Sequence, residues 1–315
     1  LLLNSFWNRP VSRRPISPFV YRNFVKAFLG NQNVDMLQGT IDVYRHFGFD
    51  LMHRNINVRL DDVAIDGPNW KVAVEETQDG ANILTKTIIR TPERKLTRVT
   101  KTQELTAFHQ VSAIVEFFIK DRDDFEQFVK YQPPVPKSPL TELKRAKEWI
   151  GDEGVTAPWI SGVFNFLADF RKLDDLLMDA LLDKGFYQDM VDYFLERLIV
   201  QVQNVLDEGV DILSYGGNVA NGSIVGPGFF ESHILPYERR LIDLIQRQRT
   251  AVLYHNCGDA RSMIEVYNQL GIAAYESMAE PPYGDNDLAD CLSRFDQSIT
   301  LVGNLDRQSA KSLSP

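Results

Sequence analysis

Cysteine and long apolar runs are both scarce in this chain of 315 residues. Its two cysteines, Cys257 and Cys291, are too few for a disulfide framework and suit the reduced thiols of the cytosol. No apolar run is long enough to span a bilayer. The first residues, Leu1 to Trp7, also lack the length and the charged flank of a signal peptide. We therefore expect a cytoplasmic protein without a membrane partner.

Positive charge is also in short supply. The chain has 34 Lys and Arg against 43 Asp and Glu, which gives a net charge of −9. No basic stripe offsets these acids, so we expect no nucleic-acid partner. With 44% hydrophobic residues the composition is that of an ordinary globular protein. A chain of this length buries a core the size of one α/β barrel or of two smaller domains.

Short apolar segments alternate along the chain with helical patterns. We predict strands at residues 16–20, 50–55, 155–160, 212–215, 251–255, 273–276 and 299–302. Helical patterns lie between them. One runs through Phe28 and stops at Gly30, Asp35 to Phe47 ends at Gly48, and Phe186 to Glu208 ends before Gly209. This order predicts a parallel α/β fold in one domain over residues 1–315, and the TIM (β/α)8 barrel is its nearest closed form. The last strand is missing from the pattern, so we expect either a truncated sequence or another closure.

A different pattern interrupts this alternation after the second predicted strand. From Trp70 to Thr102 polar and apolar residues alternate on either side of a turn at Gln78-Asp79-Gly80. These are hairpin signals, and we predict an inserted β-meander over about residues 60–105. Placed beside the barrel mouth, it would form a lid or a docking face for a partner. The alternative is a plain pair of edge hairpins.

His255 and Cys257 stand two residues apart at the end of a predicted strand. Residues at i and i+2 of a strand point to the same face, so both side chains can aim at one point. Imidazole and thiolate are ligands that zinc prefers, and a catalytic zinc needs three protein ligands. The alternative is a buried structural cysteine beside a histidine with ordinary hydrogen bonds.

Other predicted strands also end in polar residues. In α/β barrels the active site lies at the carboxyl ends of the strands, so these side chains would converge on one mouth. The alternative is that turns and helix caps require such residues. Arg54 either neutralises an anionic substrate or pairs on the surface with Asp61 or Asp62. The candidate substrate-binding residues at these ends are His53, Arg54, Asn165, Tyr215, Asn218 and Asn304.

Two of these strand ends resemble motifs of a known family. Leu301 to Asp306 resembles the Gly-Asn-Leu/Val-Asp turn of the uroporphyrinogen decarboxylase superfamily. Tyr254 to Asp259 resembles the metal strand of its corrinoid-dependent methyltransferase branch. The resemblance extends over about residues 15–314 and implies a TIM barrel with Zn²⁺ at its mouth, with His255 and Cys257 as ligands. It also implies a corrinoid carried by a partner protein.

The resemblance leaves the third metal ligand open. In the methyltransferases it is a cysteine on the last strand, which this sequence lacks. Cys291 lies in a predicted helix, Leu288 to Phe295, where we expect it to be part of the core. Glu276 is the better candidate for a carboxylate ligand or for a catalytic acid or base. Asp259 would act behind the metal ligands or cap the following helix.

The true decarboxylases of the superfamily differ at two places. They carry an arginine-rich segment at the first strand and an aspartate at the end of the second. Here Arg22 stands alone, as a candidate substrate-binding residue, and His53-Arg54-Asn55 contains no aspartate. The expected function is zinc-dependent exchange of a methyl group between a corrinoid protein and a small thiol, folate or methylated substrate. The alternatives are a uroporphyrinogen decarboxylase-like lyase, a zinc-free hydrolase or lyase using Glu276 with His53, or a non-catalytic barrel; a homodimer is compatible with each.

Overall fold

Short parallel strands joined by helices form the centre of the molecule. The computed structural model describes residues 1–59, 62–106 and 109–303. Five strands pair in the order β11-β10-β9-β8-β7, and β1 pairs with β6. Their bounds are β1 (Leu51–His53), β6 (Gly154–Thr156), β7 (Trp159–Ser161), β8 (Ile212–Gly216), β9 (Ala251–His255), β10 (Ala274–Glu276) and β11 (Thr300–Val302). The predicted α/β class with parallel sheets is confirmed, but the described strands do not close into a ring.

Two predicted strands differ from the observed ones. The segment 155–160 is divided into β6 and β7, because Pro158 has no N–H for the ladder. Its carbonyl still accepts from the amide of Ser214 in β8. The segment therefore pairs first with β1, through β6, and then with β8, through β7. Residues 16–20 form no strand. Two prolines, Pro15 and Pro18, remove ladder donors there.

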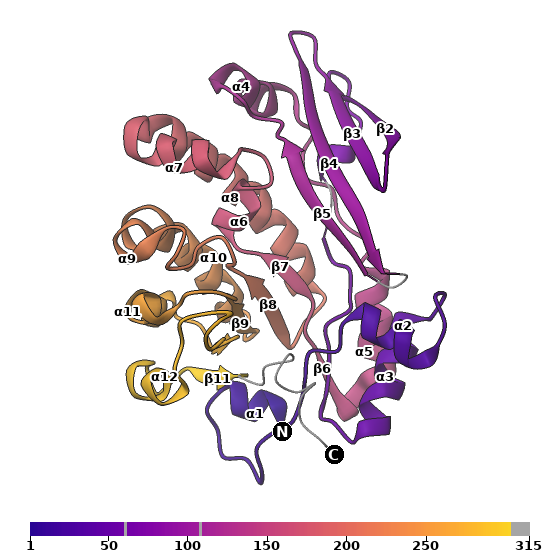
Figure 1. Ribbon diagram of the computed structural model, residues 1–315, viewed down its shortest axis with the longest axis vertical. Helices are drawn as coiled ribbons and strands as arrows, with labels where there is room; N and C mark the ends of the chain where they lie inside the picture. Colours follow the sequence, from indigo (N-terminus) through magenta and orange to yellow (C-terminus); the bar gives the residue numbers. More distant parts are fainter. Residues whose placement is uncertain (60–61, 107–108, 304–315) are drawn as a thin grey trace.

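Helices cover the outer side of the parallel strands (Figure 1). α2 (Arg22–Leu29) and α3 (Met36–Phe47) end at Gly30 and Gly48 with φ of 62° and 66°, as the glycine positions predicted. The long predicted helix is α8 (Lys184–Asp207). The other α-helices are α1 (Leu2–Phe6), α4 (Arg122–Tyr131), α5 (Thr141–Ile150), α6 (Val163–Leu167), α7 (Leu173–Leu182), α9 (Gly226–Phe229), α10 (Leu235–Arg247), α11 (Ile264–Tyr267) and α12 (Leu288–Arg294). Among the described helices there is none with the length and apolar character needed to cross a membrane.

An antiparallel sheet of four strands follows β1 in the chain. It consists of β2 (Lys71–Asp79), β3 (Asn82–Arg90), β4 (Lys95–Thr106) and β5 (His109–Glu116), so it continues past the predicted end near residue 105. Ile88, Ile89 and Leu96 at its base are buried. The base of the sheet therefore belongs to the core and lies beside α4 (Figure 1), where the hydroxyl of Thr91 donates to Gln127. The far end of the sheet is exposed at Leu105 and Val111.

The register of three neighbouring strands decides which side chains face the helices. Tyr215, Tyr254 and Tyr275 are aligned across β8, β9 and β10. Their rings are fully buried, with centroids 5.8 and 6.4 Å apart along the row. Since successive strand residues point to opposite faces, the next residues along β9 and β10, His255 and Glu276, point to the other side.

Candidate active site at the carboxyl ends of the strands

His255 and Glu276 lie side by side at the ends of β9 and β10. Their register pairs them, and Nδ1 of His255 is 3.6 Å from Oε1 of Glu276. Each side chain is 12% exposed. Cys257 follows in the loop after β9 and is exposed. Asn218, from the loop after β8, accepts a hydrogen bond from the amide of Cys257 at 3.4 Å and lies 3.5 Å from its sulfur.

The imidazole and the thiol interact with each other. Burial lowers the pKa of His255, but its hydrogen bond with Cys257 and the nearby carboxylate of Glu276 outweigh burial and raise this pKa to about 9. The hydrogen bond from His255 lowers the pKa of the Cys257 thiol. The two side chains thus converge and favour a thiolate, the form of cysteine that acts as nucleophile and metal ligand.

Arg54 reaches this site from the end of β1. Its side chain is 2% exposed, and Nη1 donates to Oε1 of Glu276 at 2.8 Å. The guanidinium lies 4.0 Å from the ring centroid of Phe19 and 5.4 Å from that of Trp159. Of the two roles that the sequence left open for Arg54, a pair exposed on the surface does not agree with its burial beside Glu276. The side chains of residues 61 and 62 lie outside the described ones.

The carboxyl group of Glu276 is ionised. Burial raises its pKa, but the charge of Arg54, the nearby imidazole of His255 and the hydrogen bond from Arg54 outweigh burial and lower this pKa to about 2. One carboxylate oxygen therefore lies between a guanidinium and an imidazole.

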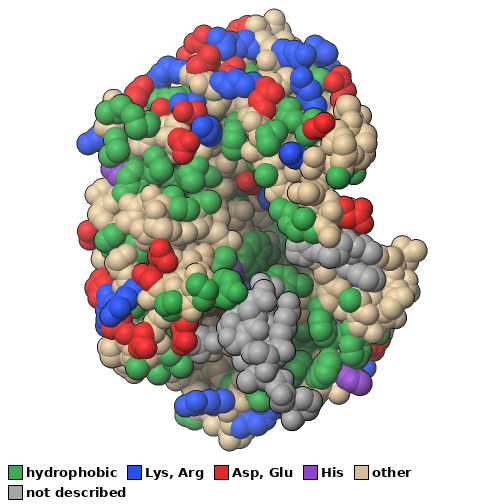
Figure 2. Space-filling model, in the orientation of Figure 1, with side chains coloured by type: hydrophobic (Ala, Val, Ile, Leu, Met, Phe, Trp, Pro, Cys, Tyr) green, Lys and Arg blue, Asp and Glu red, His purple; other side chains and the backbone are tan. Residues whose placement is uncertain are grey.

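A polar pocket opens beside Arg54 at the end of β1. It has a volume of about 330 Å³ and is lined by Arg22, Arg54, Asn55, Ile56, Asn57 and Glu142. Arg22 is exposed and donates to the carbonyl of Asn55 at 3.3 Å. His53 is 2% exposed, and burial, followed by the charge of Arg22, lowers its pKa to about 4. The molecule is hollowed on the face shown in Figure 2, with hydrophobic side chains inside the hollow.

Three predicted site residues have other roles or fall outside the description. Tyr215 does not line the mouth: it is fully buried, and its hydroxyl hydrogen-bonds Glu238. The sequence could not show this, because the direction of Tyr215 depends on its register with β9. Asn165 accepts from the amide of Val219 at 3.2 Å and so holds the loop after β8. Asn304 lies outside the described residues.

Asp259 does not cap the turn that follows it. The amides of Ala260 and Arg261 donate instead to Oδ1 of Asp285, at 2.8 and 3.0 Å. The predicted capping role of Asp259 was wrong, because a residue 26 positions later occupies that place. Cys291 is buried in α12, and its predicted place in the core is confirmed.

Sequence reasoning missed Glu238, which organises the rim near β7. It is 1% exposed on α10, and its carboxylate accepts from the amides of Val163 and Phe164 at 3.0 and 3.1 Å as well as from Tyr215. The available signal was a single acid among the apolar positions Leu235, Leu241 and Ile242 of one helix face.

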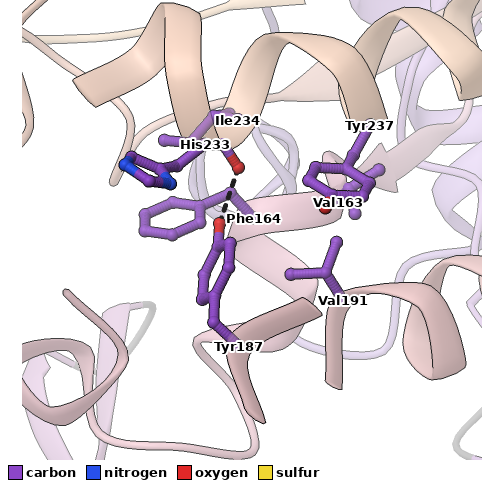
Figure 3. A pocket seen from close by; sticks show the side chains of 7 residues that line it. All are labelled: Val163, Phe164, Tyr187, Val191, His233, Ile234 and Tyr237. Carbon is purple, nitrogen blue, oxygen red and sulfur yellow. Dashed lines mark hydrogen bonds between the residues drawn. The ribbon is translucent and has the colours of Figure 1, made fainter. Parts of the chain in front are cut away.

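A narrow depression, which has no room for a bound molecule, lies between α6, α8 and the helical turn at residues 230–234. Figure 3 shows its lining, in which the Tyr187 hydroxyl donates to the carbonyl of His233 at 2.7 Å. The remaining lining residues are Val163, Phe164, Val191, Ile234 and Tyr237. The lining is largely apolar and contains no pair of groups suited to acid–base or metal chemistry.

The donor set at β9 fits part of a zinc site. Nδ1 of His255 is buried without a hydrogen-bond partner, and the Cys257 thiol is held toward the imidazole. These are two soft donors, whereas zinc takes at least three from a protein. Within residues 1–59, 62–106 and 109–303, no group of three or more His, Cys, Asp and Glu side chains is arranged to hold a metal ion.

Comparisons with known proteins agree with this architecture. Methylcobamide:CoM methyltransferase MtbA of Methanosarcina mazei is 20% identical over 199 residues, covering 62% of this chain and 57% of that protein. The MtbA of Methanosarcina acetivorans is 18% identical with the same coverage. The matched segment thus spans little more than half the length of these relatives.

A solved structure, a methyltransferase from Methanosarcina mazei, superposes with a TM-score of 0.69 over 96% of this chain and 81% of that one. At 12% identity this likeness shows the fold alone. The family model for uroporphyrinogen decarboxylase (URO-D) matches residues 140–310, which is more than half of the sequence. The chain belongs to the uroporphyrinogen decarboxylase family.

Proposed function

We propose that this protein is a methyltransferase that exchanges a methyl group between a corrinoid on a partner protein and a small thiol, folate or methylated compound. The observation that carries the proposal is the convergence of His255 and Cys257 at the carboxyl end of β9. Two distant relatives named as methylcobamide:CoM methyltransferases support it. In this proposal the two side chains hold Zn²⁺ together with a donor outside the described residues.

Each residue at the site has a role that its surroundings support. Bound zinc lowers the pKa of a thiol or polarises a heteroatom that carries a methyl group. His255 and Cys257 hold the metal, and Asn218 fixes the backbone and the sulfur of Cys257. Glu276 is ionised, so it balances positive charge beside His255. Arg22 and Arg54 line the polar pocket, where a substrate would bind.

Metal analysis of matched cysteine variants tests the proposal. We expect about one zinc per chain in the wild-type protein and in Cys291→Ser, because Cys291 is buried in α12 away from the imidazole. The variants His255→Ala and Cys257→Ser should lose the metal. They should also fail to demethylate a methylated corrinoid protein, a reaction that is measured by the absorbance of the cobalt centre. Zinc-free wild-type protein, or full methyl transfer by Cys257→Ser, would refute the assignment. Release of CO₂ from a tetrapyrrole carboxylate, by the wild-type protein and by Cys257→Ser alike, would identify the lyase alternative.

A further inference from the structure

Arg54 uses only part of its guanidinium to pair with Glu276. Nη1 donates to Oε1 of Glu276 at 2.8 Å, and the arginine side chain is 2% exposed. Nε and Nη2 are buried and have no hydrogen-bond partner among the described residues. Buried polar groups of a folded protein nearly always have a partner, so these two donors require one. A bound group with acceptor oxygens would supply it.

The two unpaired nitrogens form one edge of the guanidinium. Their N–H bonds point in the same direction within the plane of the group, and this fork matches the two oxygens of a carboxylate. A lysine ammonium carries the same charge but offers no such planar pair of donors. The edge is therefore suited to a planar group that has two oxygens and a negative charge.

Arg54 also lines the polar pocket of about 330 Å³ at the end of β1. Glu276 balances the charge of Arg54, and Arg22 adds a second guanidinium to the lining, with its side chain 50% exposed. Glu142, which lines the pocket too, lies 3.9 Å from Arg22 and is 56% exposed. Solvent screens such an exposed pair, so Glu142 opposes an anion only weakly. The pocket thus favours a small molecule with a negatively charged group.

Aromatic rings and a neighbouring amide hold Arg54 in place. Its guanidinium lies 4.0 Å from the ring centroid of Phe19 and 5.4 Å from that of Trp159, contacts that a planar guanidinium makes well. Asn55, the next residue, donates from Nδ2 to the carbonyl of Val20 at 2.8 Å and so fixes the chain after Arg54. A donor that is already held in place loses little freedom on binding, which favours affinity.

We propose that the edge formed by Nε and Nη2 of Arg54 binds a carboxylate of the substrate, with Arg22 at the rim of the pocket. This inference rests on the proposed function, because it names the class of compound whose methyl group is exchanged. The oxygen of Glu276 that pairs with Arg54 is also 3.6 Å from Nδ1 of His255. A carboxylate bound to Arg54 therefore lies within one side chain of His255, close enough for the rest of a small molecule to reach it.

Three small probes that differ in one group test the assignment without relying on turnover: butyrate, its uncharged counterpart butyramide, and propane-1-sulfonate. Their affinities are measured by NMR titration of the wild-type protein and of Arg54→Lys, Arg22→Met and Arg171→Met, with circular dichroism to monitor folding. Arg54→Lys can keep the ion pair with Glu276 but lacks the planar edge. Arg171→Met is the matched control, because Arg171 and Asp179 form another buried pair, with side chains 8% and 13% exposed.

We expect the wild type to bind butyrate at least about tenfold more tightly than butyramide, and Arg54→Lys to bind butyrate about 10–100-fold more weakly, because hydrogen bonds to charged groups are strong. Arg22→Met should weaken butyrate binding about 2–5-fold, and less so at high salt, because Arg22 is exposed. Propane-1-sulfonate, whose oxygens are arranged tetrahedrally, should bind more weakly than butyrate. Arg171→Met should bind all three probes as the wild type does.

The outcomes separate this inference from the proposed function. Equal affinities for butyrate and butyramide, an Arg54→Lys affinity for butyrate within about twofold of the wild type, or tighter binding of the sulfonate would overturn the carboxylate site, even if methyl transfer is observed. If butyrate binds through Arg54 but the protein neither holds zinc nor demethylates a corrinoid protein, the proposed function fails and the carboxylate site stands.

Should Arg54→Lys not fold, the arginine Nε–H signals of the ¹⁵N-labelled protein decide. Because Nε of Arg54 is buried, its signal should exchange slowly with water. A slowly exchanging signal that is also present in Arg171→Met, and that shifts with butyrate but not with butyramide, supports the inference. If no such signal shifts with butyrate, the inference is refuted.

Discussion

Glu238 offers the sharpest test of how the rim of the site is held. Replacing it with alanine removes the acceptor for the amides of Val163 and Phe164 and for the hydroxyl of Tyr215. The surroundings are buried, so each stranded donor costs about 1–3 kcal/mol. Water that enters the vacated space recovers part of this cost. We therefore expect the free energy of unfolding to fall by about 3–5 kcal/mol.

Urea unfolding followed by circular dichroism measures this loss, with an unchanged m-value as the check that only stability has changed. Tyr215→Phe is the comparison variant, because it removes one of the three donors and leaves both amides bound to Glu238. It should cost about 1–2 kcal/mol. A loss below about 1 kcal/mol for Glu238→Ala would show that the carboxylate does not organise the β7–α6 turn, and the reasoning would fail.

Three further predictions concern other parts of the chain. Gly217→Ala should lower stability by about 1–3 kcal/mol, because a Cβ there would lie 2.2 Å from the hydroxyl of the buried Tyr254; an unchanged thermal midpoint would show that the ring can move. His53 has a pKa lowered from 6.5 to about 4, so the unfolded chain takes up a proton that the folded chain refuses as the pH falls through this window. Stability should drop by up to about 3 kcal/mol between pH 6.5 and 4, and His53→Gln should lack that part of the pH dependence in urea unfolding. Leu96→Ala at the buried base of the antiparallel sheet should cost about 2–4 kcal/mol, whereas Val111→Ala at its exposed end should change stability by less than about 0.5 kcal/mol; similar effects at both positions would contradict the view that only the base is core.

Local signals in the sequence predicted the elements that local physics determines. Gly30 and Gly48 end α2 and α3 because their positive φ is easy for glycine. The spacing of His255 and Cys257 predicted that both would turn to one side of β9. The strand predicted at residues 16–20 was wrong. The segment is apolar, but Pro15 and Pro18 have no N–H to donate to a neighbouring strand.

Contacts between residues far apart in the sequence could not be predicted, because they depend on the register of the strands and on how the sheets are arranged. Arg54 and Glu276 are 222 residues apart, and no local pattern indicates that the end of β1 reaches the end of β10. Tyr215 was predicted at the mouth, but its alignment with Tyr254 turns it toward the helices. A shift of one residue in that register would reverse the assignment, which is why strand-end residues could be identified from sequence more readily than their directions.

The charges at the site also bear on the role of Glu276, which the sequence left open between a carboxylate ligand and a catalytic acid or base. With a pKa lowered to about 2, protonating it at neutral pH costs about 7 kcal/mol, at 1.36 kcal/mol per pH unit. Such a group is a poor general acid, because efficient acids have a pKa near the working pH. Its surroundings instead stabilise the ionised form beside His255. In the proposed function Glu276 is therefore an ionised group beside the ligands His255 and Cys257 and not the proton donor.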